Sequence, residues 1–178
     1  MASLRDYLFY EEPGITLYCG DCREVLPLLT CPNTTYCLEE CDGRCEPLSI
    51  VTDPPYGHGD RWQGGTWGAA TMYKDAMRWD AQRFGDDDLR VIVEKAKTAI
   101  VWGGNYFALP PSRCWLAWIK SSAMPTLADF ELAWTSLDRP SKAFTEDRNP
   151  DGRRWHPTQK PLALMTWCLS FCEGTILD

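Results

Sequence analysis

The residues best placed to do chemistry form one tetrapeptide, Asp53-Pro54-Pro55-Tyr56, which directly follows the β-branched run Ile50-Val51-Thr52. This run is typical of the end of a buried parallel strand, and the prolines end it because they have no N–H group for the sheet. Asp53 therefore stands at the carboxyl end of a strand, where ligands bind in open α/β sheets. A carboxylate, proline carbonyls and an aromatic ring can hold a planar group that carries an exocyclic amine. Acceptors on the N–H bonds of that amine make its nitrogen a better nucleophile.

The alternative is that this tetrapeptide is only a tight turn after a strand, because Asp and Pro are common turn residues. A given tetrapeptide occurs by chance in about one in a thousand chains of this length. The motif is therefore suggestive by itself, and other stretches of the chain must support it.

Length and composition favour one domain, over residues 1–178, because 178 residues that are 44% hydrophobic can bury a sizeable core. The N-terminus lacks the apolar segment of a signal peptide, and no apolar run approaches the length of a membrane span. We therefore expect a cytoplasmic protein with no membrane partner. Nine cysteines without a secretion signal favour reduced thiols or metal ligands over disulfides.

The net charge of −7 is unevenly distributed, and it excludes a uniformly basic nucleic-acid-coating protein. Six basic and three acidic residues lie between Arg139 and Lys160, so this segment carries +3 and the rest of the chain −10. A solvated loop of mixed charge and a nucleic-acid-binding segment both fit this pattern.

The first chemical feature along the chain is an acidic turn at Gly20-Asp21. Residues 15–19 alternate as a strand, and Asp21 can cap a helix at residues 22–26. Asp21 is either that cap alone or an acceptor for a ligand amino group at the same sheet edge as Asp53. Cys19 and Cys22 flank the turn as a C-x-x-C pair, and we expect both to pack there.

Four cysteines within fifteen residues follow this helix: Cys31, Cys37, Cys41 and Cys45. Tetrahedral zinc would fold such a segment, which has no core of its own. Their spacing lacks a paired C-x-x-C, so free or redox-active thiols are the alternative. The sequence thus predicts a small zinc-binding insertion at residues 31–45.

A stretch rich in glycine, tryptophan and charge follows Tyr56, and we interpret residues 57–80 as a substrate-side loop. Its apolar content is too low for a packed element, yet its tryptophans and arginine can stack on bases. A disordered connection with incidental aromatics is the alternative.

The middle of the chain predicts a second crossover unit. Asp86-Asp87-Asp88 is expected to cap an amphipathic helix, which a buried strand at residues 99–102 and a turn at 103–105 follow. Strands are predicted at 115–119 and 130–134. They favour antiparallel pairing, because the link between them is too short for a helix.

The last part of the chain predicts a helix and a short strand. Pro161 suits the first turn of a helix at residues 162–172, which Gly174 ends. A strand at residues 175–177 then stops at Asp178. The predicted fold class is therefore α/β.

Four motifs together carry a resemblance to a known family: LYCGDCREVLP at 17–27, TDPPYG at 52–57, VWGGNYF at 101–107 and HPTQKP at 156–161. In order and spacing they resemble the amino-methylating DNA methyltransferases of the permuted β class, in the small forms found in phages and restriction–modification systems. The resemblance implies a Rossmann-like class I methyltransferase sheet. It also implies a partner, double-stranded DNA, and an S-adenosylmethionine-dependent enzyme that flips out a base and methylates its exocyclic amine.

The resemblance further assigns catalytic roles within the tetrapeptide. Asp53 and the Pro54 carbonyl would accept the amine hydrogens, Pro55 would complete the rigid turn, and Tyr56 would stack on the base. The residues implied for cofactor binding are Asp21, Cys22, Thr158, Lys160, Pro161 and Asp178. Asp21 would lie by the cofactor adenine, and residues 158–161 by its methionine part.

Two features depart from the family pattern. The insertion at 31–45 lengthens a connection that is usually short. The glycine-rich cofactor loop, Pro-Phe-x-Gly-x-Gly, usually follows Leu-Asp, but this sequence ends at Asp178. We therefore expect an incomplete catalytic domain that is inactive alone and needs a further segment, in cis or as a second polypeptide.

Adenine is the favoured target, because enzymes that methylate the cytosine amine usually carry Ser at the position of Asp53. Enzymes acting on RNA or protein usually carry Asn there. A non-catalytic, zinc-stabilised DNA-binding remnant is the alternative outside catalysis. Residues 138–155 would be the short target-recognition segment, and they contain no readable code for a DNA sequence.

Overall fold

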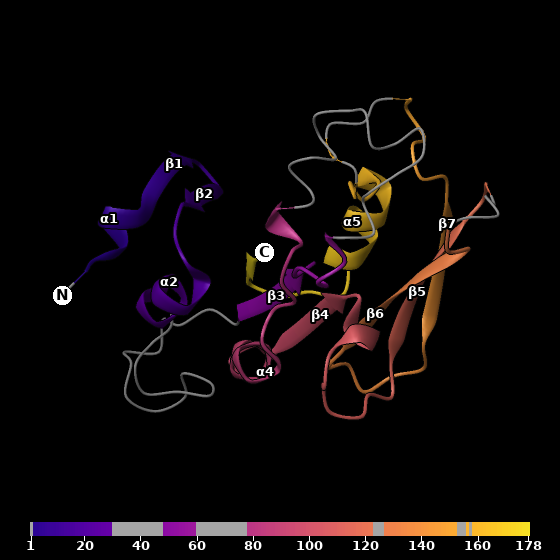
Figure 1. Cartoon of the computed structure of the whole chain (residues 1–178), viewed down its shortest axis with the longest axis horizontal. Helices are drawn as coiled ribbons and strands as arrows, with labels where there is room; N and C mark the ends of the chain where they lie inside the picture. Colours follow the sequence, from indigo (N-terminus) through magenta and orange to yellow (C-terminus); the bar gives the residue numbers. More distant parts are fainter. Residues whose placement is uncertain (1, 30–47, 60–77, 123–126, 153–155, 157) are drawn as a thin grey trace.

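The computed structural model describes residues 2–29, 48–59, 78–122, 127–152, 156 and 158–178. Its largest element is a six-stranded sheet in the order β7-β5-β6-β4-β3-β8 (Figure 1). The strands are β3 (Leu48–Thr52), β4 (Thr98–Trp102), β5 (Trp115–Lys120), β6 (Phe130–Thr135), β7 (Lys142–Glu146) and β8 (Thr175–Leu177).

The strand directions bring most strand ends to one edge of this sheet. β3 runs parallel to β4 and β8, and β5 runs parallel to β7. β6 is antiparallel to both β4 and β5, as predicted for the second of these pairs. The other five strands therefore point the same way, and their carboxyl ends meet at one edge together with the start of β6.

The core lies on both faces of β4, whose five residues are all buried. Ile100 packs in a cluster with Leu164 of α5 (Leu162–Leu169), whereas Val101 packs in a second cluster with Leu89 of α4 (Asp86–Glu94). Because neighbouring residues of a strand point to opposite faces, α5 and α4 cover opposite faces of the sheet. This layered α/β architecture with a mixed sheet is compatible with a Rossmann-like fold.

The start of α4 differs from the prediction. Its N-cap is Gly85, without a side-chain cap, and the aspartates occupy the first helical turn. Asp86 instead binds the Arg83 guanidinium at 2.6 Å and accepts the Ala108 N–H at 2.9 Å. Negative charge in a first turn still favours the helix through its dipole. At the other end of the chain α5 is shorter than predicted and ends at Leu169, with Ser170 as its C-cap.

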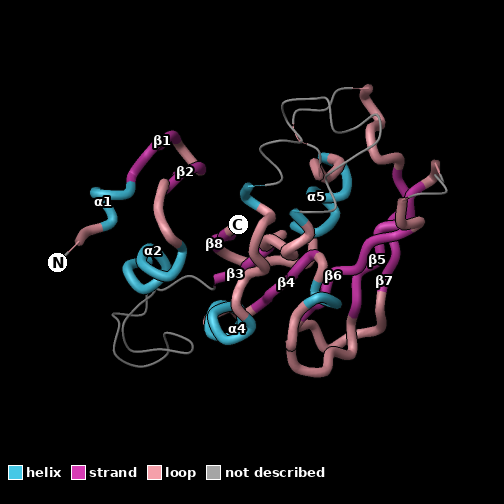
Figure 2. The backbone as a smooth tube through the Cα atoms, in the orientation of Figure 1, coloured by secondary structure: helices cyan, strands magenta, loops and turns pink. Residues whose placement is uncertain are grey.

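The N-terminal segment forms a separate unit beside the large sheet (Figure 2). It consists of α1 (Leu4–Tyr7), β1 (Leu8–Glu12), β2 (Ile15–Tyr18) and α2 (Cys22–Leu29). The predicted strand at residues 15–19 is present as β2. Its neighbour among the described strands is β1, which pairs with it antiparallel around the turn at Pro13-Gly14, and not a strand of the large sheet.

β7 lies within residues 138–155, the predicted target-recognition segment, in which no strand was predicted. Residues Leu116 to Lys120 of β5 pair with β7, and Phe144 packs against the core cluster that contains Leu164. Only one apolar ring anchors this edge strand, which is why the sequence pattern did not reveal it. The helices of the described residues include none with both the length and the apolar character that a membrane crossing requires.

Candidate functional site

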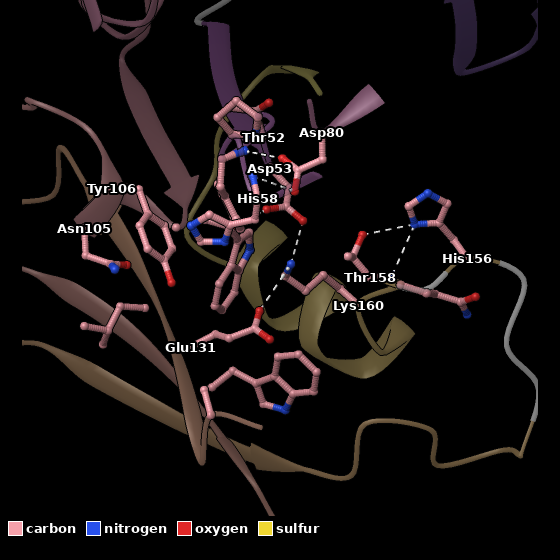
Figure 3. Close-up of a pocket in the computed structure, with 18 of the residues that line it drawn as sticks. Thr52, Asp53, His58, Asp80, Asn105, Tyr106, Glu131, His156, Thr158 and Lys160 are labelled. Atoms are coloured by element: carbon pink, nitrogen blue, oxygen red, sulfur yellow. Dashed lines mark hydrogen bonds and ion pairs between the residues drawn. The ribbon is translucent and has the colours of Figure 1, made fainter. Parts of the chain in front are cut away.

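A cavity of about 890 Å³ opens at the edge where the five strands end (Figure 3). Its lining includes one residue at or just after each of these strands: Asp53 after β3, Gly103 after β4, Lys120 in β5, Arg148 after β7 and Asp178 after β8. Glu131, at the start of the antiparallel β6, completes the set. A cavity of this size falls within the range of small-molecule sites.

The Asp53 carboxylate accepts two hydrogen bonds inside this cavity. It accepts the Tyr56 hydroxyl, and it accepts the Lys160 ammonium at 2.6 Å. Burial raises the pKa of Tyr56, and the neighbouring Asp53 charge raises it further. Tyr56 therefore keeps its proton and remains a donor. The structure thus brings together three of the residues that the sequence singled out.

Asp80 holds the turn that carries Asp53 and Tyr56, and no spacing pattern in the sequence indicates this role. It is 2% exposed, and its carboxylate accepts the backbone N–H groups of Tyr56 at 2.8 Å, Gly57 at 2.9 Å and His58 at 3.1 Å. Gly57 adopts a φ of +76°, which favours glycine, and a Cβ there would meet the Arg83 backbone nitrogen at 2.9 Å.

Replacing Asp80 with alanine is expected to lower the free energy of unfolding by about 2 to 4 kcal/mol, because three N–H groups lose a charged acceptor. Chemical denaturation measures the change. Asp87→Ala is the matched control, since the Asp87 side chain is 95% exposed and its removal should cost less than about 0.5 kcal/mol. Equal effects of the two substitutions would contradict the role of Asp80.

Aromatic rings form one wall of the cavity, on the side of β4. The Tyr56 and Tyr106 rings are tilted to each other with centroids 4.9 Å apart, and the His58 ring meets Tyr106 edge-on at 4.8 Å. Gly103 allows this packing, because its φ is +66° and a Cβ there would lie 2.2 Å from the Tyr56 ring. This wall offers flat surfaces against which a planar ligand can stack.

A chain of alternating charges crosses the floor of the cavity (Figure 3). Lys160 lies between Asp53 at 2.6 Å and Glu131 at 3.3 Å, and Lys120 binds Glu131 at 2.7 Å. The side chains of Lys160 and Lys120 are only 9% and 7% exposed, respectively. Glu131 and Lys120 were not predicted from the sequence. The available signal was a carboxylate within the otherwise apolar segment 130–134.

These contacts keep both partners of the Lys160–Glu131 pair charged. Burial alone would raise the pKa of Glu131, but the charge of Lys160 and the contact with Lys120 hold it below its ordinary value. Burial alone would lower the pKa of Lys160, but the Asp53 and Glu131 carboxylates raise it. The charges on the cavity floor are therefore matched by their neighbours.

Other residues predicted for cofactor binding also lie at or beside the cavity. Thr158 and Asp178 line it, and Pro161 is the N-cap of α5. The Thr158 N–H and hydroxyl lie 3.3 and 3.0 Å from His156 Nδ1. Partial burial lowers the pKa of His156, so its neutral ring can accept these bonds.

The structure does not bring Asp21 and Cys22 to this cavity. Both lie in the N-terminal unit, because β2 pairs with β1 instead of with the large sheet. Asp21 accepts the Arg23 N–H at 2.9 Å, as a helix cap does, and hydrogen bonds from Arg23 lower the pKa of Asp21 to about 2. Asp21 therefore matches the capping alternative.

The predicted zinc ligands Cys31, Cys37, Cys41 and Cys45 lie outside the described residues, as does most of the predicted substrate-side loop. Within the described ranges, no three His, Cys, Asp or Glu side chains are grouped as metal ligands. The cysteines of these ranges are free, and Cys19 and Cys22 are exposed, so the prediction that both pack at the acidic turn is wrong. Zinc binding stays a prediction.

No protein-family model, curated protein or solved structure matches the chain. Its fold and cavity define an α/β protein with a mixed sheet and a polar, aromatic-walled cavity at the carboxyl edge of that sheet.

Proposed function

We propose that this chain is an S-adenosylmethionine-dependent DNA methyltransferase domain that acts on the exocyclic amine of adenine, with the target base flipped into the cavity. One observation carries the proposal: the Asp53 carboxylate is presented on a hydrogen-bonded turn, in contact with the Tyr56 hydroxyl, at the carboxyl edge of an α/β sheet where ligands bind. The resemblance of the four sequence motifs supports the same activity, and the presence of Asp at position 53 favours adenine.

The turn offers two acceptors to an amine. Asp53 supplies a carboxylate oxygen, and the Pro54 carbonyl has no donor from any described residue. The Pro55 carbonyl is already bound to the Phe84 N–H at 3.0 Å, so Pro55 fixes the turn and is not a second acceptor. Two accepted N–H bonds direct the nitrogen lone pair out of the plane of the base.

The hydrogen bond between Lys160 and Asp53 must break before an amine can bind to Asp53. Glu131 gives the ammonium group a second carboxylate at 3.3 Å, so Lys160 can remain paired when the amine arrives. A base amine would then occupy the Asp53 oxygen that Lys160 holds at 2.6 Å. In this exchange Lys160 keeps Glu131 as its ion-pair partner, and the Asp53 carboxylate accepts a hydrogen bond from the neutral amine.

The cavity fits the proposed cofactor in size and in polar groups. About 890 Å³ suits a nucleoside-sized ligand beside a base, Thr158 supplies a hydroxyl, and Asp178, which follows β8, supplies a carboxylate. These residues would hold the cofactor close to Asp53. When bound, S-adenosylmethionine supplies an electrophilic methyl group on its sulfonium sulfur.

Binding of an unpaired adenine tests the proposed base flipping. A duplex with adenine opposite an abasic site should bind about tenfold or more tightly than the fully paired duplex, because the unpaired base costs less to extrude. Fluorescence anisotropy of labelled duplexes measures both affinities, and a duplex with thymine opposite the abasic site is the control. Equal affinity for all three duplexes would count against base flipping.

A further inference from the structure

Arg148 brings an unmatched positive charge to the wall of the cavity. Its Nη2 donates to the Ala128 carbonyl over a long 3.4 Å, whereas Nε and Nη1 are enclosed and meet no partner within the described ranges. A guanidinium has five N–H donors and keeps its charge in proteins. Most of the N–H donors of Arg148 therefore have no acceptor among the described residues.

The other cations of the described cavity wall are already neutralised. Lys120 is paired with Glu131, and Lys160 with Asp53 and Glu131. Arg148 has no such carboxylate among the residues that the structure describes. Enclosed N–H groups without acceptors are unfavourable. Since a long 3.4 Å bond is the hydrogen bond that the described residues give this guanidinium, a turn of the side chain that presents its fork to an oxyanion in the cavity would remove this penalty.

The position of Arg148 indicates which oxyanion it receives. β7 and β8 are the two ends of the sheet, so Arg148 and Asp178 stand at opposite ends of the carboxyl edge, and Asp53 follows the strand beside β8. A cofactor group near Asp178 would lie at the far end from Arg148. The side of the cavity toward β7 is also lined by Phe130, which is 53% exposed and can stack on a base.

We propose that Arg148 binds a backbone phosphate of the DNA, adjacent to the nucleotide whose base enters the cavity. This inference rests on the proposed function. Arg148, in the segment after β7, then has a specific role. It anchors the DNA strand through a backbone phosphate and does not read base edges there. Arg148 thereby sets how far the target nucleotide is from Asp53.

Salt-dependent DNA binding tests this site. Arg148→Met is expected to weaken binding of a short duplex about 5- to 20-fold and to reduce the slope of log affinity against log salt by about 0.9. Arg148→Lys should keep most of the slope but lose part of the affinity. Arg113→Met is the matched control, because Arg113 precedes β5 at the opposite edge of the sheet and pairs with Asp138.

Duplexes that carry one neutral methylphosphonate locate the contact. At one position the neutral group should weaken binding by the wild-type protein but leave binding by Arg148→Met unchanged. Equal weakening of both proteins at every position would overturn the phosphate contact. The wild-type protein itself should show the loss of affinity at that one position. A poorly folded Arg148→Met variant therefore does not decide the result.

The outcomes separate the phosphate site from the proposed function. Normal DNA binding by Arg148→Met, with an unchanged salt slope, would overturn the phosphate site alone. A loss of affinity only for S-adenosylmethionine would also overturn it, because the oxyanion would then be the cofactor carboxylate. A wild-type protein that does not bind DNA would overturn the proposed function and this inference with it.

Discussion

Asp53→Ala, made in the protein completed with a glycine-rich cofactor loop, is expected to reduce methyl transfer to DNA by about 10²- to 10³-fold, because the amine loses the charged acceptor that strengthens as the transition state forms. Affinity for S-adenosylmethionine should change little, since Asp53 faces the base. Transfer of a tritiated methyl group to plasmid DNA measures the rate, and calorimetry measures cofactor binding in the same preparation.

The structure supplies a matched control for this substitution. Asp87 is an aspartate whose side chain is 95% exposed, and it lies on α4 outside the cavity lining, so Asp87→Ala should retain wild-type activity. In Asp53→Ala, Lys160 keeps Glu131 as a partner, which favours retention of the fold. An Asp53→Ala protein that works at more than about a tenth of the wild-type rate would rule out this role for Asp53.

Lys160→Met is expected to lower the free energy of unfolding by about 3 to 5 kcal/mol, the largest stability effect that the site predicts. The substitution removes the cation that binds both Asp53 and Glu131, so these carboxylates lose a buried partner. Denaturant unfolding measures the loss. Lys97→Met is the control, because Lys97 pairs with Glu173 at the surface and its loss should cost less than about 1 kcal/mol.

A second substitution separates charge from packing. Adding Asp53→Asn to Lys160→Met removes the carboxylate that the single substitution leaves without a cation, because Glu131 still pairs with Lys120. The double variant should therefore recover at least about 1 kcal/mol relative to Lys160→Met. Strictly additive losses would show that the ion pair does not couple these residues.

The pH dependence of stability gives an independent check on the ion pair between Lys160 and Glu131. The pKa of Glu131 is lowered in the folded state, so its stabilisation is present above the ordinary value of 4.5 and is lost as the pH falls through the folded value. The pKa of Lys160 is raised, so its contribution is present below 10.5 and is lost as the pH rises through its folded value. The stability difference between wild type and Lys160→Met should therefore shrink on acidification from pH 7 to about pH 3.

The parts of the fold that the sequence predicted are those in which a local pattern and burial agree. Residues 99–102 are apolar throughout and form most of the fully buried β4, and residues 115–119 and 130–134 form the predicted antiparallel pair. β7 escaped prediction because one half-buried ring, Phe144, anchors it. β1 and its pairing with β2 were likewise not predicted.

The residues of the candidate site that adjoin the end of a strand were predicted from the sequence. The residues that reach the site only through tertiary contacts were not. Asp53 and Tyr56 follow β3 directly, so their position could be predicted from the sequence. Asp80 reaches the same turn from 22 to 24 residues further along the chain, and Glu131 reaches Lys160 from a different strand. No periodicity encodes such contacts.

Identification of the methylated nucleoside tests the central claim most directly. DNA is incubated with S-adenosylmethionine carrying a deuterated methyl group, and with the protein both as the 178-residue chain and with a glycine-rich loop added after Asp178. Mass spectrometry of the digested DNA should find the labelled methyl group on the exocyclic nitrogen of deoxyadenosine, and Asp53→Ala should abolish it. Label on the cytosine amine would contradict adenine as the target, and DNA without label in either form would contradict the proposed methyl transfer.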